Sequence, residues 1–173
     1  MADTWTKELR VEELRAGHIL IGSEDGEHLT LDASALWLWK GRARAYASLR
    51  LTYGSPAFTL YDANGQERLD LAIAGDGTPY VHLRDGNGNP RLSWYLTESG
   101  HARLECLDGE DKTRLRLSLD EDESDPAIAL CDRQGKEILE IMSDGDGRPA
   151  LILRNAEGHR VPWLTTPAEK EED

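Results

Sequence analysis

The sequence predicts an all-β protein, an antiparallel β-meander of about seven repeats with two strands each. Three observations predict this fold class. From Asp32 onward one phrase returns every 23 or 24 residues, each copy carries two short runs that alternate apolar and polar residues, and turn residues separate the runs. The 173 residues are enough for one domain of ordinary size.

The repeat is clearest in two neighbouring copies, which read Pro56-Ala-Phe-Thr-Leu60-Tyr-Asp62-Ala-Asn-Gly65 and Pro79-Tyr-Val-His-Leu83-Arg-Asp85-Gly-Asn-Gly88. Other copies begin at Gly17, Asp32, Ala102, Pro126 and Pro149, and in the Ala102 copy Asp111 stands in the place of the glycine. A fixed period of this length is the signature of a repeat architecture. We therefore predict a single β-repeat domain over residues 17–164, with an N-terminal lead-in over 1–16 and a disordered acidic tail over 165–173.

Each unit is expected to form two strands and two turns. In the unit from Pro56, one run carries Phe58 and Leu60 and the other carries Leu69, Leu71 and Ile73, with other residues between them. This period of two is typical of strands with one buried face. Between the runs lies Asp-x-x-Gly, in which the aspartate can bond its own backbone and the glycine can take a positive φ. The turn glycines predicted in this way are Gly65, Gly88, Gly135 and Gly158.

Strands that follow one another at this spacing leave no room for crossover helices, so neighbours must be antiparallel. Their apolar side chains then share one face, while the other face carries polar or small residues such as Thr59, Asp70, His82 and Ser93, which we expect in water. A sheet with one apolar face has to cover it. We expect the face to pack in an oligomer, with a trimeric three-sided prism as the preferred form. A closed barrel or a sandwich is the alternative.

An arginine recurs twelve residues after the start of four units, at Arg44, Arg68, Arg91 and Arg114. At the entry of a strand it can pair with the aspartate of the same hairpin and so fix the register of the two strands. The predicted register pairs are Asp62–Arg68, Asp85–Arg91 and Asp108–Arg114. A ladder of ligand-binding arginines is the functional alternative.

Two stretches resemble the Asp-x-x-Gly-x-x-Arg hairpin repeats of many bacterial proteins, namely Leu60-Tyr-Asp62-x-x-Gly65-x-x-Arg68 and Leu83-x-Asp85-x-x-Gly88-x-x-Arg91. Such repeats include the tyrosine–aspartate repeats of large secreted shells and repeats of phage-tail-like fibres. The resemblance implies a structural β-repeat that is often oligomeric, and it supplies no catalytic residues.

The alternation breaks at Leu36-Trp37-Leu38-Trp39, which is apolar on both faces of a strand. With the leucines on the apolar face, Trp37 and Trp39 point outward together, and Tyr46 follows nearby. Two outward tryptophans indicate a contact with a partner chain, with the first strands of this chain, or with a flat ligand such as a sugar.

Charge and spacing argue against several classes of site. The formal net charge of −13 repels nucleic acid and anionic membranes. No two histidines are four residues apart, and Cys106 and Cys131 lack the spacing of metal ligands, so we expect no cofactor and no enzyme. Asp120, Asp122 and Asp125 are a weak calcium candidate, but they do not match the spacing of an EF-hand, and a solvated acidic hairpin is the favoured interpretation.

The sequence contains no run that predicts a signal peptide or a membrane helix, which favours a cytoplasmic protein; the resemblance leaves a phage-like or secreted assembly open. Residues 5–16 are compatible with a short helix or with a strand. The function that we expect is structural, a scaffolding or assembly module that acts through protein–protein contacts, with copies of itself as partners and another protein as a further one. The alternative is a small-ligand or carbohydrate-binding β domain that uses Trp37 and Trp39.

Overall fold

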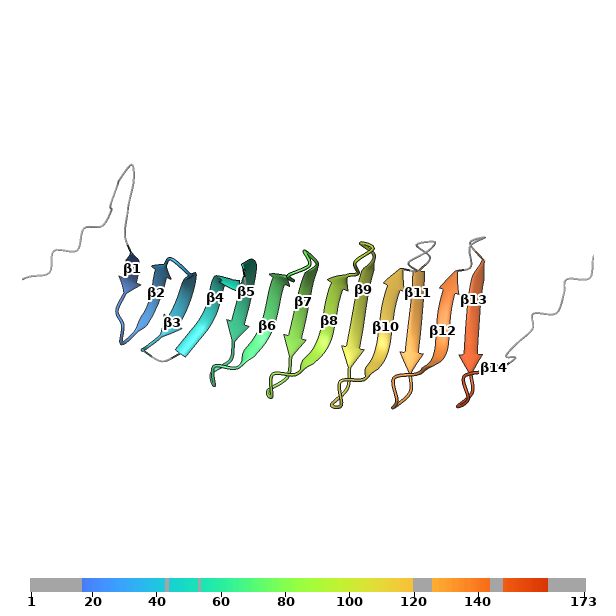
Figure 1. The fold of residues 1–173 in the computed structure, drawn as a ribbon. Helices are drawn as coiled ribbons and strands as arrows, with labels where there is room; N and C mark the ends of the chain where they lie inside the picture. The colour runs from blue at the N-terminus through green and yellow to red at the C-terminus, as the bar shows by residue number, and fades with distance from the viewer. Residues whose placement is uncertain (1–16, 43, 53, 120–125, 144–147, 162–173) are drawn as a thin grey trace, which may run out of the picture.

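A computed structural model describes residues 17–42, 44–52, 54–119, 126–143 and 148–161, which form one antiparallel sheet whose strand order follows the chain (Figure 1). The predicted all-β meander is therefore confirmed. The sheet is open, with β1 at one end and β14 at the other, so the alternative of a closed barrel is wrong. The lead-in, the acidic tail and the calcium candidate Asp120, Asp122 and Asp125 lie outside the described residues.

Each predicted unit contributes two strands. In chain order they are β1 (His18–Gly22), β2 (Glu27–Asp32), β3 (Ala35–Lys40), β4 (Arg44–Thr52), β5 (Ser55–Tyr61), β6 (Glu67–Ile73), β7 (Pro79–Arg84), β8 (Pro90–Leu96), β9 (Ala102–Leu107), β10 (Thr113–Leu119), β11 (Pro126–Cys131), β12 (Glu137–Ser143), β13 (Pro149–Arg154) and β14 (Arg160–Val161).

In each Asp-x-x-Gly turn, the aspartate side chain accepts hydrogen bonds from backbone N–H groups of the same turn. At the turn between β5 and β6, a carboxylate oxygen of Asp62 accepts the N–H of Asn64 at 2.8 Å and the N–H of Gln66 at 3.1 Å. The N–H of Gly65 donates to the carbonyl of Asp62 at 3.0 Å, with a φ of +79° at Gly65. Equivalent turns lie at 85–88, 108–111, 132–135 and 155–158.

Asp111 stands in the glycine place of its turn and takes a φ of +59°. It is the one residue other than glycine with a positive φ in the described part of the chain. An aspartate tolerates this region better than most residues, because its short polar side chain can bond locally.

We expect Gly88→Val to lower the free energy of unfolding by more than ~1 kcal/mol, because a β-branched residue at the φ of +86° is a genuine outlier. The site offers room, since the nearest atom to an added Cβ, Oε1 of Gln66, would be 3.7 Å away, so the cost is backbone strain. Asp111→Gly is the matched control and should be neutral or stabilising. Thermal melts measure both, and an unchanged melt for Gly88→Val would contradict the hairpin assignment.

A β-bulge recurs in five hairpins at the same place of the unit. Between β5 and β6, Leu60 pairs with Leu69 and Tyr61 pairs with Glu67, so Arg68 has no residue opposite it. The residues at this bulge position are Tyr46, Arg68, Arg91, Arg114 and Ile138. The unit from Asp32 therefore places Tyr46, and not Arg44 as the spacing predicted, at the position of the other arginines.

The register brings the apolar side chains of all strands onto one side, which we call the apolar face. Its middle line, the central row, runs through Leu36, Leu49, Phe58, Leu71, Val81, Trp94, Leu104, Leu117, Ile128, Ile141 and Leu151. From β5 to β13 the strands lie side by side with little change of direction (Figure 1). Long sheets normally accumulate twist, and flat ones are usually stabilised by stacking or by side-chain ladders.

The expectation of a water-exposed polar face is wrong for its central residues. Thr59 is 0% exposed, Ser48 1% and Asp70 7%, whereas Leu71 on the apolar face is 54% exposed and Trp94 56%. Small polar residues are covered by longer neighbours on their own face. The large apolar residues receive no such cover from the described residues, which form a single open sheet without a second layer.

Ion pairs cover the polar face, and two of them span a strand. Arg50 on β4 reaches Glu67 on β6 at 2.9 Å, across β5 and its buried Thr59. Arg116 on β10 contacts Glu137 on β12, across β11 and its buried Ala129. Ion pairs between its own side chains thus cover the buried residues of the polar face.

Candidate functional site

The apolar face is the largest candidate interaction surface in the described part of the chain. Its residues between 37% and 66% exposed include Leu51, Phe58, Leu60, Leu83, Leu117, Ile128, Leu130 and Ile141, beside Leu71 and Trp94. No charged residue occupies the apolar rows of β5 to β13. A shallow hollow of 810 Å³ lies against Trp94, Leu104, Leu117, Ile128 and Ile141. Single exposed leucines are normal, but a contiguous patch marks an interaction site.

The predicted contact residues Trp37 and Trp39 lie on the polar face and are half-buried. Their ring centroids are 5.3 Å apart; Trp39 stacks on His28 at 6.2 Å and Trp37 on Tyr61 at 6.1 Å. The indole N–H of Trp39 donates to Oγ1 of Thr30 at 2.9 Å. The structure does not place Tyr46 in this group of ring contacts.

A groove of 370 Å³ opens beside the two tryptophans. It is lined by aromatic rings and by charged side chains, including those of Glu24, Asp32 and Arg42. The hydrogen-bond donors and acceptors of a sugar, together with its apolar ring face, match such a mixed lining. Part of this lining is already engaged, since Nε of Arg42 lies 2.9 Å from a carboxylate oxygen of Asp25.

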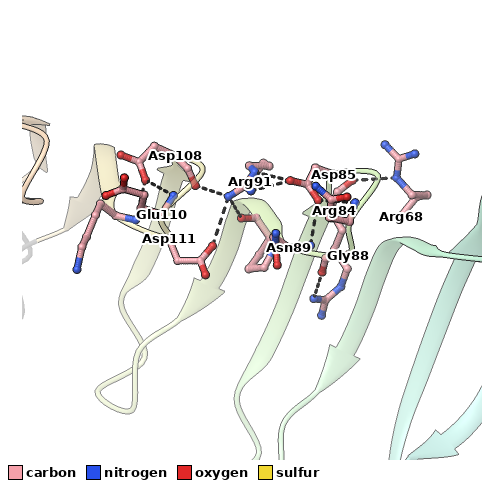
Figure 2. A network of polar contacts seen from close by, with 12 residues as sticks. Arg68, Arg84, Asp85, Gly88, Asn89, Arg91, Asp108, Glu110 and Asp111 are labelled. Atoms are coloured by element: carbon pink, nitrogen blue, oxygen red, sulfur yellow. Dashed lines mark hydrogen bonds and ion pairs between the residues drawn. The ribbon is translucent and has the colours of Figure 1, made fainter.

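The structure brings each predicted Asp–Arg pair together along the hairpin edge, the edge formed by the Asp-x-x-Gly turns. Figure 2 shows one of these pairs, Arg91 with Asp85. The nitrogen–oxygen distances are 3.2 Å for Arg68–Asp62, 2.6 Å for Arg91–Asp85 and 3.6 Å for Arg114–Asp108. At the bulge, the side chain of each arginine points toward the aspartate in the turn of its own hairpin. Ile138 occupies this position in the next unit, so the hairpin of Asp132 has no arginine at its bulge.

Two of these arginines, Arg68 and Arg91, also reach the following unit. Nε of Arg68 donates to the carbonyl of Arg84 at 3.0 Å, and Arg91 donates to the carbonyl of Asp108. Arg91 further lies 3.3 Å from a carboxylate oxygen of Asp111 (Figure 2). Arg68 and Arg91 thus each link two neighbouring hairpins, which the sequence pattern did not indicate.

We expect Arg68→Ala to lower stability by only about 0.2 to 1 kcal/mol, because the side chain is 43% exposed and the pair is screened by solvent. Arg91→Ala should cost more, since Arg91 is 27% exposed and contacts Asp85, Asp108 and Asp111. Urea unfolding of both variants measures the difference. A larger loss for Arg68→Ala than for Arg91→Ala would contradict this order.

The turn carboxylates are held in their charged form by the backbone. The N–H of Asn64 lowers the pKa of Asp62, and the N–H of Glu110 lowers that of Asp108, with further hydrogen bonds or charges of the same turns adding to the effect. At Asp85 burial raises the pKa, but the N–H of Asn87 and the Arg91 guanidinium outweigh it, so its pKa is also lowered.

His82 lies in the middle of the polar face, where its ring centroid is 4.5 Å from that of Tyr80. Its Nδ1 is buried without a hydrogen-bond partner. Burial and the nearby Arg84 guanidinium lower the pKa of His82 below 6.5, and Asp70 opposes this shift.

We expect acidification to cost stability through His82. A lowered folded-state pKa means that the unfolded chain binds the proton more readily, so the contribution is full above pH 6.5 and is lost as the pH falls below it. The melting temperature should therefore fall from pH 7.5 to pH 5.5 less steeply in His82→Gln than in the original chain. If the melting temperature changed equally with pH in both proteins, the loss of stability could not be assigned to His82.

Polar residues that sequence reasoning missed include the pairs Asp70–Arg84 and Glu140–Arg154, with nitrogen–oxygen distances of 3.0 Å and 3.2 Å. Both pairs are separated by 14 residues, so a search for acid–base spacing within the repeat could have found them. Among the described residues there is no group of histidine, cysteine and carboxylate side chains that could hold a metal ion.

No protein-family model matches the sequence, and no match to it is found among curated proteins. The part of the chain that the structure describes contains no helix with the length and hydropathy of a membrane span.

Proposed function

We propose that this protein is a non-catalytic structural module that assembles with copies of itself through the apolar face. The observation that carries the proposal is that an uncharged, uncovered sheet face runs along the strands from β5 to β13. In water this face would expose many large aliphatic and aromatic side chains, whereas the polar face satisfies its own charges. Burial of such an apolar surface against a partner lowers the free energy of the protein, because it removes the apolar side chains from water.

The size of the face supports a specific interface. Fourteen strands about 4.8 Å apart make a row about 60 Å long, and three inward residues per strand span about 14 Å, so the whole apolar face covers about 850 Å², of which the uncharged part from β5 to β13 makes up about 550 Å². Stable interfaces bury about 800 Å² per partner, while the largest apolar patch of a typical monomer is about 300 to 600 Å². A second copy offers a matching surface of the same length and chemistry.

The flatness of the sheet also supports a second copy of the chain as the partner of the apolar face. A strongly twisted strip would bring only a few strands of two copies together, whereas strands β5 to β13 keep nearly one direction (Figure 1). The preferred form is a prism of three chains, with the apolar faces inside and the polar faces outside. The acidic outer surface would keep such an assembly soluble and would repel nucleic acid.

Static light scattering tests the proposal. The expected mass is a multiple of 19.3 kDa, with three chains for the prism. A mass of two chains would replace the prism by a two-layer arrangement and keep the assembly. A mass of one chain at micromolar concentration would overturn the proposed function.

A second candidate function, carbohydrate binding, is favoured by the groove beside Trp37 and Trp39. Stacking of a sugar on an indole would change tryptophan fluorescence, and Trp39→Ala should abolish the change. Trp94 lies on the apolar face and serves as the control, because Trp94→Phe should leave a response from the groove intact. A panel of oligosaccharides without any such response would set this candidate aside.

A further inference from the structure

Trp94 is the largest side chain of the central row and is exposed on the apolar face. It pairs with Val81 on β7 and with Leu104 on β9, and both neighbours are smaller than an indole. Trp94 is 56% exposed, against 54% for Leu71, the next most exposed residue of the row. Because an indole is also larger than a leucine side chain, Trp94 exposes more apolar area than any other residue of the central row.

The hollow of 810 Å³ begins beside Trp94 and extends over β9 to β13. One side of it is lined by large side chains of the central row, such as Leu117 and Ile128. On the side away from the hairpin edge, its lining includes short side chains, which are those of Ala102, Pro126, Ser143 and Pro149. The same face of one chain thus presents a projecting aromatic side chain and an apolar depression.

We propose that Trp94 is the anchor of the assembly and inserts into the hollow of a second copy. The inference rests on the proposed assembly through the apolar face. It names the residue and the surface that contribute most to the association of the copies.

A second copy fits because every chain carries both parts. A face that associates with its own copy must be complementary to itself. Two such faces pressed together with Trp94 outside the hollow would touch first at the two indoles, and the empty hollow would lose packing contacts along its lining. Insertion of Trp94 removes both problems, and the lining of the hollow is apolar like the ring that enters it.

Trp94 also has the properties of an interface hot spot. Binding energy at protein interfaces is concentrated in a few residues that fill pockets near the centre of the contact, and tryptophan is enriched among them. Trp94 lies on β8, next to the middle strand of the uncharged stretch from β5 to β13. In an assembly, the apolar side chains on both sides of Trp94 along the row would exclude water from it.

Truncation of the anchor tests the inference in the full chain. Trp94→Ala should raise the concentration at which half of the chains are assembled by at least about 30-fold, as expected for a hot spot. Leu71→Ala is the matched control, because Leu71 has nearly the same exposed fraction in the same row but does not line the hollow. It should raise this concentration by less than about 5-fold. Light scattering over a dilution series measures both, and circular dichroism verifies that the strands are intact.

Filling the hollow separates insertion of Trp94 from a general effect of apolar area. Ala102 lines the hollow and is exposed, so Ala102→Phe adds apolar area to the face, which by itself should strengthen association. If the hollow receives Trp94 of a second copy, the added ring takes its place, and association should instead weaken by at least about 10-fold. In the Trp94→Ala background the same change should cause no further weakening, because no indole remains to be excluded.

The outcomes distinguish the inference from the proposed function. If the chain assembles but Trp94→Ala weakens association no more than Leu71→Ala, the anchor is overturned and the assembly remains. The same holds if Ala102→Phe fails to weaken association, or weakens it further in the Trp94→Ala background. A monomeric mass of the original chain at micromolar concentration overturns both. Binding of an apolar dye to that monomer, lost in Trp94→Ala, would make the hollow a ligand site in place of an interface.

Discussion

Leu71→Glu is expected to convert the proposed assembly into single chains. Leu71 lies in the central row and is 54% exposed in the chain, so its side chain would be buried between copies. A carboxylate at that position would be buried without a partner, which costs several kcal/mol, and every copy in the assembly would carry it. Light scattering should report 19.3 kDa at concentrations where the original chain is oligomeric.

Leu20→Glu is the matched control for this variant. Leu20 is a leucine of β1 that lies on the polar face, opposite Thr30, and it is 36% exposed. The same substitution there should leave the mass of the assembly unchanged. A monomeric Leu20→Glu, or an oligomeric Leu71→Glu, would show that the apolar face is not the interface.

Asp70→Ala is expected to produce the largest loss of stability among the polar substitutions, about 2 to 3 kcal/mol. The Asp70 carboxylate accepts the hydroxyl of the fully buried Thr59 at 2.9 Å and two N–H groups of Arg84 at 3.0 and 3.3 Å. Its removal leaves a buried hydroxyl and a largely buried guanidinium without this acceptor. The measurement is urea unfolding at pH 7.

Two further variants show which part of the loss in Asp70→Ala comes from the charge and which from the buried acceptor. Asp70→Asn keeps an oxygen for Thr59 but removes the charge that faces Arg84, so it should cost less than Asp70→Ala. Glu67→Ala removes a carboxylate that is 37% exposed and should cost about 1 kcal/mol or less. Equal losses for Asp70→Ala and Glu67→Ala would contradict the special role of the buried acceptor.

The hairpins were predictable because their information is local. Asp62 and Gly65 lie within four residues of each other, and one hydrogen-bonded turn fixes both of their roles. Asp111 was predictable by phase alone, since it stands where Gly65 and Gly88 stand in their units. The confirmed strand order follows for the same reason, because short turns join only neighbours.

The bulges and the covered polar face were not predictable in this way. Whether Arg68 pairs or bulges depends on which residue of the facing strand lies opposite it, and the alternation of one strand does not fix this. The burial of Thr59 depends on Arg50 and Glu67, which belong to the strands on either side. A residue that is polar by phase can thus be buried by neighbours that are distant in the sequence.

The candidate contact residues were found in part. The break in alternation located Trp37 and Trp39 on the polar face, but Tyr61, which packs against Trp37 from two strands away, gave no signal in the sequence. The apolar face was visible as a pattern. Its lack of cover was not, because closure of a sheet depends on twist, which no single unit encodes.

The pairing of every strand with its sequence neighbours alone also bears on how the chain folds. All-β proteins are usually slow to fold because their strands must find partners far along the chain, but here each closing loop is a single hairpin. Nucleation at any one hairpin can spread outward in both directions, as in linear repeat arrays. If the chains assemble as proposed, the slow step is their association, and refolding should then speed up as the protein concentration rises.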